Sequence, residues 1–264
     1  MAPDPIFFSA SHGVFAPTGH ARGPWDADAL HGGAPAALIV RTIEDLGTGL
    51  ALGRLTIDYL GPVPLAPLTL AASVVRPGRR FAVAEATVEA DGRRRCFARA
   101  VLIRREPVAL PPHWSPPAPP PLAAPEDGEP SQFPVEGAVG FDEAFHLTAF
   151  DIRFVGGDYH AGPADVWFRL RRPLVDDEPA TPLEALAATA DFGNGVGHVL
   201  DFERFLFVNL DLGIQITRAP AGEWIGLAAR TELGDDGTGV ARSMLHDVSG
   251  PVGSASQTLF VATR

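Results

Sequence analysis

A histidine followed by two glycines stands directly before an apolar run, in the stretch HGGAPAALIVRTIED at residues 31–45. Two glycines at the start of a helix let a ligand or another chain segment come close to the backbone. They also leave free N–H groups at the positive end of the helix dipole, where an anion or a polarised carbonyl is favoured. The alternative is a tight turn that lets the helix pack closely on a strand, and this stretch alone leaves both interpretations open.

Two polar residues near the end of the chain lie in apolar surroundings. Asp191 follows the run LEALAATA, where a buried carboxylate is costly unless it has partners. It could instead be a residue at the helix C-terminus, near Gly193, that faces solvent. Gln257 alternates with Ala255 and Leu259, which predicts the inward face of a strand. A buried amide needs hydrogen-bond partners, and either a bound water or a neighbouring element could supply them.

Several other chemistries are disfavoured by the composition. All 21 basic residues are arginine, which excludes chemistry that depends on a P-loop lysine or a Schiff-base lysine. The single cysteine, Cys96, excludes an intramolecular disulfide and a cysteine-based metal site. The eight histidines are scattered without ligand-like spacing, so we expect no metal. The G-x-S-x-G turn of serine hydrolases does not occur.

The charge and hydropathy patterns narrow the expected partners and location. A formal net charge of −11 argues against nucleic acid or an anionic membrane as the main partner. The opening MAPDPIFFSASHGV is unlike a signal peptide, and no apolar stretch approaches membrane-spanning length, so we expect a cytoplasmic protein. Arginines nevertheless cluster at Arg76–Arg80, Arg93–Arg95 and Arg104–Arg105. These clusters are either solvated turn residues or a patch for a phosphate-bearing ligand.

The elements that must position these residues occur in the same order twice. A helix over 34–45 precedes the strand RLTIDYL, and an apolar helical segment over 182–194 precedes FLFVNLDLGIQI. Three strands joined by turns follow in each half, with turn signals such as ADGR and DDGTG. The sequence therefore predicts a duplicated α+β unit, each copy an antiparallel sheet wrapped on one central helix.

A proline-rich connector separates the two copies. Residues 107–134 carry eleven prolines and neither lysine nor arginine, which is typical of a stiff, extended segment without its own core.

The HGG turn before a helix wrapped by antiparallel strands resembles the hotdog fold. Two such units on one chain resemble the double-hotdog acyl-CoA thioesterases of the type II bacterial family. The resemblance is strongest at HGGAPAALIVR, ADFGN, NLDL and SASQTLFVATR, and it rests on their order and spacing. It implies a tandem hotdog of two antiparallel sheets, with an N-terminal unit over 1–106, the linker over 107–134 and a C-terminal unit over 135–264. It also implies hydrolysis of acyl-CoA to free fatty acid and CoA, in lipid metabolism and without a cofactor.

The resemblance implies roles for individual residues. In that family an Asp on the second helix, a Thr on the next strand and a Gln on the last strand hold the water that attacks the thioester. The Asp corresponds to Asp191 and the Gln to Gln257, whereas the Thr position is occupied by Asn209. This departure is chemically tolerable, because an amide both accepts and donates hydrogen bonds. The substrate would bind at the His31-Gly32-Gly33 turn, whose N–H groups would polarise the thioester carbonyl. His31 would brace this turn.

The same residues predict one working site and leave alternatives open. In the first half, Arg99 is expected at the position of Gln257, and the helix position that matches Asp191 is near Arg41, so that half lacks the groups. A hotdog hydratase would need an Asp and a His together, for which His198 is the only candidate partner of Asp191. A non-catalytic acyl-CoA-binding protein is the main alternative, and Asn209 is its best support. A homo-oligomer is compatible with the sequence.

Overall fold

The computed structural model describes residues 3–113, 122–131, 142–159, 162–176 and 178–264. The strands before the connector are β1 (Phe7–Ser11), β2 (Val14–Pro17), β3 (Ala51–Tyr59), β4 (Leu68–Arg76), β5 (Phe81–Ala90) and β6 (Arg93–Ile103). The later strands are β7 (Glu129–Ser131), β8 (Phe150–Gly157), β9 (Ala164–Leu170), β10 (Phe205–Asn209), β11 (Asp211–Ile216), β12 (Trp224–Leu233), β13 (Thr238–Asp247) and β14 (Gly250–Thr263).

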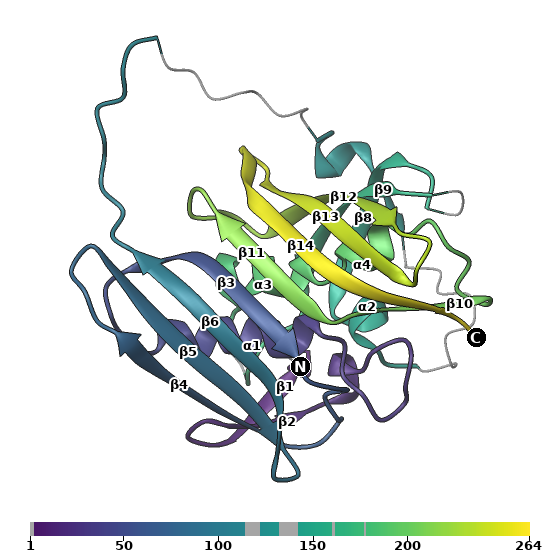
Figure 1. Ribbon diagram of the computed structural model, residues 1–264, viewed down its shortest axis with the longest axis horizontal. Coiled ribbons are helices and arrows are strands. Elements are labelled where there is room, and N and C mark those ends of the chain that lie inside the picture. Colours follow the sequence, from purple (N-terminus) through teal and green to yellow (C-terminus); the bar gives the residue numbers. More distant parts are fainter. Residues whose placement is uncertain (1–2, 114–121, 132–141, 160–161, 177) are drawn as a thin grey trace.

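These strands form one continuous sheet within the described residues, where two sheets were expected. Its order is β1-β2-β4-β5-β6-β3-β11-β14-β13-β12-β9-β8-β7, and β10 adds to β14 (Figure 1). The halves join where β3 pairs antiparallel with β11, so that Asp58 faces Asp211. Edge-to-edge pairing satisfies backbone N–H and C=O groups that two separate sheets would leave exposed at their edges.

The strand order reads alike in both directions from this junction. On one side β3 is followed by β6, β5 and β4, and on the other β11 is followed by β14, β13 and β12. Each set is one strand after a helix and then three strands connected by turns, as the sequence predicts. The order therefore supports an internal duplication with the junction of β3 and β11 near its centre.

The helices are α1 (Gly33–Glu44), α2 (Phe145–Thr148), α3 (Pro182–Ala190) and α4 (Gly193–Val196), with 3-10 turns η1 (Gly19–Ala21) and η2 (Pro125–Asp127). Most of α1 is buried, in agreement with its apolar sequence. A capping box starts α3: Thr181 accepts from the Glu184 N–H, and Glu184 accepts from the Thr181 N–H. The helix predicted over 182–194 is interrupted after Ala190, so that Asp191 is the C-terminal cap of α3.

The two long helices lie side by side on one face of the sheet and run antiparallel (Figure 1). At one end Gly33 lies against the Ala188 carbonyl. At the other end Arg41 of α1 forms an ion pair with the buried Glu184 of α3, at 3.4 Å between Nη1 and Oε1. The start of α1 is therefore next to the end of α3, and the end of α1 is next to the start of α3.

The proline-rich connector contributes to the fold where it is described. Residues 114–121 and 132–134 of the predicted linker lie outside the described residues. Between them, η2 leads into β7, which pairs with β8 at the edge of the sheet. The indole N–H of Trp167 donates to the Ala123 carbonyl at 2.7 Å. This part of the connector therefore packs on the second half rather than standing free of it.

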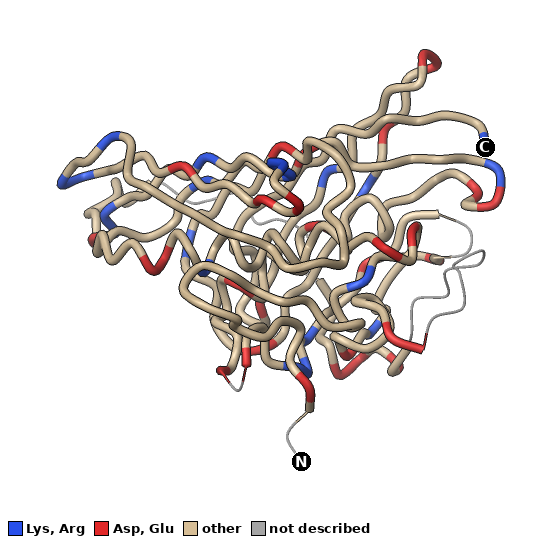
Figure 2. The backbone as a smooth tube through the Cα atoms, turned by 90° about the horizontal axis from the view of Figure 1, so that it is seen from below, with Lys and Arg blue, Asp and Glu red and all other residues tan. Residues whose placement is uncertain are grey.

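The arginine clusters of the first half lie at strand ends (Figure 2). Arg80 lies in the turn between β4 and β5, Arg93–Arg95 begin β6, and Arg104–Arg105 follow β6. The Arg104 N–H donates to the Arg80 carbonyl at 2.8 Å. Two of the three clusters are thus neighbours at one end of β6, and the third lies at the other end.

Candidate active site

A cavity of about 340 Å³ lies where the start of α1 meets the end of α3. Residues from both halves line it, including Gly32 and Tyr59 from the first half and Asp191 and Asn209 from the second. Trp25 also lines the cavity. Its ring stacks on Phe202 of the second half with 5.4 Å between the centroids. The volume and the mixed apolar and polar lining are typical of a small-molecule site.

The Asp191 side chain is the polar centre of this cavity. It is buried, and three side chains donate hydrogen bonds to its Oδ1. The donors are Asn209 Nδ2 at 3.1 Å, Gln257 Nε2 at 3.2 Å and the Tyr59 hydroxyl at 3.3 Å. Three donors on one carboxylate oxygen fix the position of the side chain. The structure thus brings Asp191, Asn209 and Gln257 together, and the other oxygen, Oδ2, has none of these donors.

Gln257 supports Asp191 from behind. Its side chain is buried, and it does not line the cavity. Its Nε2 also donates to the Asp191 carbonyl at 3.0 Å, and its Oε1 accepts from the Asn194 N–H at 2.8 Å. The inward strand position predicted from the sequence agrees with this placement. Because these bonds occupy the amide, Gln257 can orient Asp191, whereas the family pattern implies direct contact with water.

The His31-Gly32-Gly33 turn faces Asp191 Oδ2. His31 Nδ1 is 3.2 Å from that oxygen and also 3.1 Å from the Gly33 nitrogen. One imidazole nitrogen cannot both accept from the Gly33 N–H and donate to Asp191, so the tautomer decides which contact is a hydrogen bond. In the tautomer whose Nδ1 accepts, the Gly33 N–H donates to His31, and in either tautomer Gly33 does not line the cavity. Gly32 does line it, and its N–H forms no hydrogen bond with the described part of the chain.

Gly32 is required at its position by the close approach of the two halves. A Cβ at residue 32 would lie 2.7 Å from Asp191 Oδ2 and 3.0 Å from the Tyr59 hydroxyl oxygen. Contacts this short force a neighbouring group to move. The sequence left open whether the glycine pair allows close approach to the backbone or only forms a tight turn. At Gly32 the structure shows the close approach.

Tyr59 is a site residue that the sequence reasoning missed. Burial, together with the Asp191 carboxylate, raises the pKa of Tyr59 well above its usual value, so the hydroxyl stays protonated and donates. It contacts the Gly32 carbonyl at 3.1 Å as well as Asp191. The available signal was the alternation of Leu55, Ile57 and Tyr59, which places Tyr59 on the inward face of β3.

Polar atoms without a hydrogen-bond partner also lie around the cavity. Within the described residues these are Asn194 Oδ1, Asn209 Oδ1 and both ring nitrogens of His146. Burial, and to a lesser extent His31, lowers the pKa of His146 to about 4, so its ring is neutral at pH 7. Buried acceptors of this kind are satisfied by water or by a ligand.

One prediction about the first half differs from the structure. Arg99 does not occupy a position like that of Gln257: its side chain is exposed on the outer face of β6, where it pairs with Glu85 at 3.6 Å. Cys96 and Ala98 take the inward positions, because successive residues of a strand alternate between faces. Arg41 lies in the last turn of α1, whereas Asp191 caps the end of α3, so Arg41 is near the position that matches Asp191 in the duplicated fold; there it pairs with Glu184.

The remaining candidates are placed as follows. His198 Nδ1 bonds to the Gly195 carbonyl at 2.9 Å, and its ring packs on Tyr159 and Phe202. The described residues contain no cluster of His, Cys, Asp and Glu suited to a metal ion. Among the same residues, the helices are too short or too polar to cross a membrane.

Both halves of the chain match models of one protein family. Residues 21–105 match the acyl-CoA thioesterase N-terminal domain, and residues 116–261 match the acyl-CoA thioesterase C-terminal domain. The chain belongs to the acyl-CoA thioesterase family. It is a thioester hydrolase, as the resemblance predicts. No curated protein matches the chain in sequence.

Solved structures show that the enzyme has a hot dog fold. A putative thioesterase from Novosphingobium aromaticivorans is 24% identical with a TM-score of 0.71, over 98% of this chain and 99% of that one. A putative thioesterase II from Thermobifida fusca is 18% identical with a TM-score of 0.71, over 97% and 95%. A protein with a hot dog fold from Alicyclobacillus acidocaldarius is 18% identical with a TM-score of 0.69, over 97% and 96%.

Proposed function

We propose that the enzyme hydrolyses acyl-CoA to a fatty acid and CoA, with Asp191 as the general base. The observation that carries this proposal is the buried Asp191 carboxylate, whose Oδ1 receives three hydrogen bonds while Oδ2 lacks these donors. A carboxylate held in this way can take a proton from water through Oδ2. Thioesters need little further activation, because the carbonyl is electrophilic and the thiolate leaves readily.

The proposed reaction uses groups from both halves of the chain. The Asn209 Oδ1 atom is buried without a partner among the described residues, and it would accept one hydrogen bond from the nucleophilic water. As the water oxygen bonds to the carbonyl carbon, Asp191 takes the proton. The Gly32 N–H would hold the negative charge that develops on the carbonyl oxygen. Collapse of the intermediate breaks the carbon–sulfur bond and leaves the carboxylic acid. The departing CoA thiolate takes the proton from Asp191, which restores the carboxylate.

The other site residues act through Asp191 in this proposal. Gln257 and Tyr59 hold the carboxylate in place. His31 braces the turn that presents Gly32, and it packs against the ring of Phe192, 4.4 Å between centroids. The Gly33 N–H stabilises that turn through His31 rather than contacting the substrate.

We also propose that each half is one hotdog unit, over residues 1–106 and 135–264, joined by the segment 107–134. The matching order of strands on the two sides of the junction of β3 and β11 supports this division. The N-terminal family model ends at residue 105, which supports the first boundary, whereas the C-terminal model begins at residue 116, inside the connector.

A thiol-release assay tests the proposed substrate class. The full chain is incubated with a panel of acyl-CoA thioesters that differ in chain length, and free CoA is followed with a thiol reagent. We expect turnover of at least one chain length by the wild-type protein and its loss in Asp191→Asn. Binding of acyl-CoA without release of thiol above the background rate would favour the non-catalytic alternative.

A further inference from the structure

A second cavity lies at the opposite end of the helix pair from Asp191. Its volume is about 410 Å³, larger than that of the candidate active site. It lies where the end of α1 meets the start of α3, with Glu44 and Thr181 on that side. By the order of the elements around it, this cavity is the counterpart of the candidate active site in the duplicated fold.

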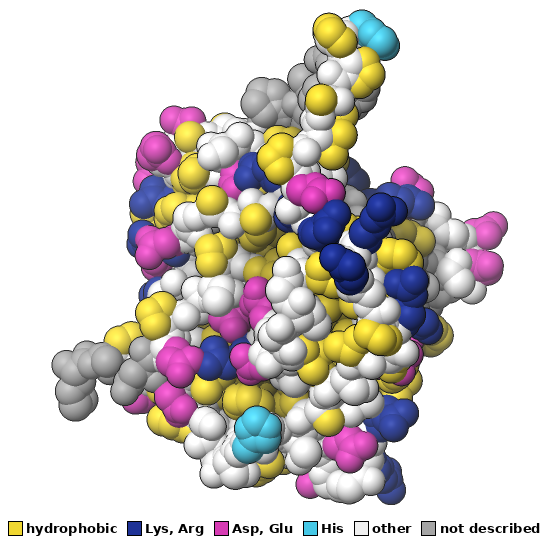
Figure 3. All heavy atoms as spheres, turned by 90° about the vertical axis from the view of Figure 1, so that its left-hand side faces the viewer, with side chains coloured by type: hydrophobic (Ala, Val, Ile, Leu, Met, Phe, Trp, Pro, Cys, Tyr) yellow, Lys and Arg dark blue, Asp and Glu magenta, His cyan; other side chains and the backbone are white. Residues whose placement is uncertain are grey.

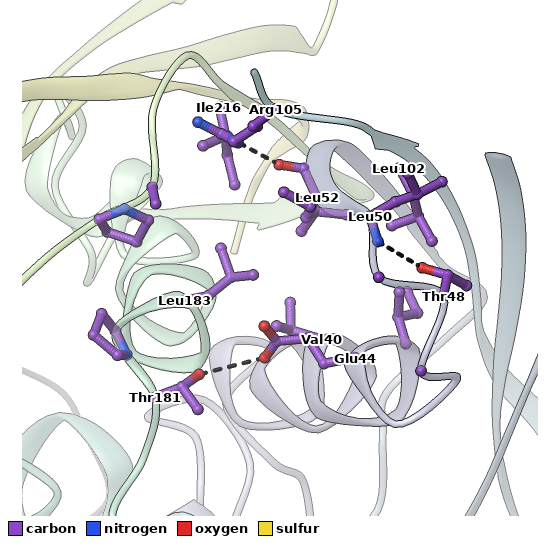
Figure 4. A pocket seen from close by; sticks show the side chains of 17 residues that line it. Val40, Glu44, Thr48, Leu50, Leu52, Leu102, Arg105, Thr181, Leu183 and Ile216 are labelled. Carbon is purple, nitrogen blue, oxygen red and sulfur yellow. Dashed lines mark hydrogen bonds between the residues drawn. The ribbon is translucent and has the colours of Figure 1, made fainter. Parts of the chain in front are cut away.

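The walls of this second cavity are mainly apolar (Figure 4). The apolar side chains that line it are Val40, Leu50, Leu52, Leu102, Leu183 and Ile216. Leu50 and Leu183 are only partly buried, so the cavity presents apolar surface to water. A hydrocarbon chain would cover that surface with a favourable change in free energy.

One wall carries a positive charge that the described residues do not neutralise. The Arg105 guanidinium donates to the carbonyls of Leu52 and Thr217, each at 3.3 Å, and it has no ion pair within the described part of the chain. Arg80 lies near the same end of β6, because its carbonyl accepts from the Arg104 N–H. Figure 3 shows basic side chains gathered beside apolar surface, at the base of the projecting segment that follows β6.

The opposite wall carries an acidic group that sets the direction of a bound ligand. Glu44 accepts from the Thr181 hydroxyl at 3.4 Å, across the cavity from Arg105 (Figure 4). Partial burial, followed by the charge of Glu184, raises the pKa of Glu44. An anionic head is repelled at Glu44 and attracted at Arg105, so the head belongs at Arg105 and the chain belongs along the leucines.

We propose that this second cavity binds a single acyl chain with an anionic head, and that it does so without catalysis. Asp45 caps α1 as Asp191 caps α3, but Asp45 is exposed and does not line this cavity, so the cavity lacks the buried carboxylate of the candidate active site. Free fatty acid and acyl-CoA both have the required chemistry, so the reaction itself supplies candidate ligands. This second binding site uses none of the residues proposed for hydrolysis. A test of binding at this site is therefore independent of a test of the proposed hydrolysis.

Calorimetric titration of the full chain tests the second site. The probes are decanoate and decyl-CoA, a thioether that cannot be hydrolysed. Leu183→Trp fills the cavity, Arg105→Gln removes the charge for the head, and Arg94→Gln is the matched control because Arg94 is an exposed arginine at the other end of β6. For at least one probe we expect Leu183→Trp to bind one equivalent fewer than wild type. For the same probe, Arg105→Gln should weaken one equivalent by about 10-fold to 100-fold, and Arg94→Gln should match wild type.

The outcome also identifies the source of the ligand. A loss seen with decanoate assigns the site to free fatty acid, and a loss seen with decyl-CoA alone assigns it to acyl-CoA. Equal stoichiometry in wild type and Leu183→Trp would overturn the proposal. Binding with wild-type affinity by Arg105→Gln would also overturn the proposal. This second variant decides the question if Leu183→Trp does not fold.

Discussion

At the residue scale, the proposed chemistry depends on Asp191. The Asp191→Asn substitution keeps the size of the side chain and removes its ability to take a proton. We expect kcat for acyl-CoA hydrolysis to fall by about 10²-fold or more, with little change in KM, because water activation matters mainly in the transition state. Steady-state kinetics with the best substrate of the panel measures this. Unchanged turnover would show that the base is another residue.

Asn209 and Gln257 touch the same carboxylate oxygen, yet they differ in their access to the cavity. Asn209 lines it, whereas Gln257 lies behind Asp191. We expect Asn209→Thr, which restores the family pattern, to be neutral or to raise kcat. Gln257→Ala should lower kcat less than Asp191→Asn, because Tyr59 and Asn209 still hold the carboxylate. A rate loss in Asn209→Thr as large as that in Asp191→Asn would contradict these roles.

At the scale of elements, the start of α1 must come close to the end of α3. Gly32→Ala would place a methyl group 2.7 Å from Asp191 Oδ2 and displace the carboxylate. We expect a loss of about 10²-fold in kcat/KM, the usual effect of a misplacement near 1 Å. Gly195→Ala is the matched control in the same cavity, because nothing lies within 4 Å of its added Cβ. Equal effects of the two substitutions would show that close approach at Gly32 does not matter.

An ion pair between the partly exposed Arg218 and the buried Asp247 joins the β11–β12 loop to the β13–β14 hairpin. Arg218 Nη1 and Nη2 each lie 2.5 Å from an Asp247 carboxylate oxygen. Burial opposes the charge of Asp247, but the bonds from Arg218, Ser249 and Ala221 hold its pKa below the usual value. The unfolded chain therefore takes up the proton at higher pH than the folded protein does. The pair stabilises the fold above about pH 4, and this contribution is lost as the pH falls through the lowered pKa.

Denaturant unfolding at several pH values measures that contribution. At pH 7 we expect Asp247→Asn to lower the free energy of unfolding by about 1–3 kcal/mol, with the half-exposed Arg218 limiting the effect. The difference from wild type should shrink as the pH falls below about 4 and through the lowered pKa of Asp247. Asp235→Asn, at an exposed turn, should stay within about 0.5 kcal/mol of wild type. A difference that does not depend on pH would contradict the assignment to the ion pair.

At the scale of the whole molecule, the halves share one sheet and one pair of packed helices. The Tyr59 N–H donates to the Leu210 carbonyl at 2.9 Å across the junction, and Trp25 stacks on Phe202 of the other half. We expect both halves to unfold in one transition, with far-UV circular dichroism and tryptophan fluorescence giving the same midpoint. Two separate midpoints would show that one half stays folded without the other.

The sequence by itself determined the elements and their repetition. Apolar periodicity located α1 and most of α3, because a helix that packs on a sheet needs a continuous apolar face. Alternation along the last strand predicted that Gln257 points inward, because strand side chains alternate between faces. The same alternation along β6 places Arg99 on the outward face. The sequence therefore also contained the information that Arg99 is not at the position of Gln257.

Only the tertiary structure decided how these elements combine. Whether the copies form two sheets or one depends on β3 meeting β11, and strand edges carry no side-chain pattern that names a partner. The burial of Asp191, the contact with Tyr59 and the distinction between Gly32 and Gly33 all depend on how α1 packs against α3. The Tyr59–Asp191 contact joins residues 132 positions apart in the chain. Hydrogen bonds are also sensitive to shifts of a few tenths of an ångström, which residue spacing cannot specify.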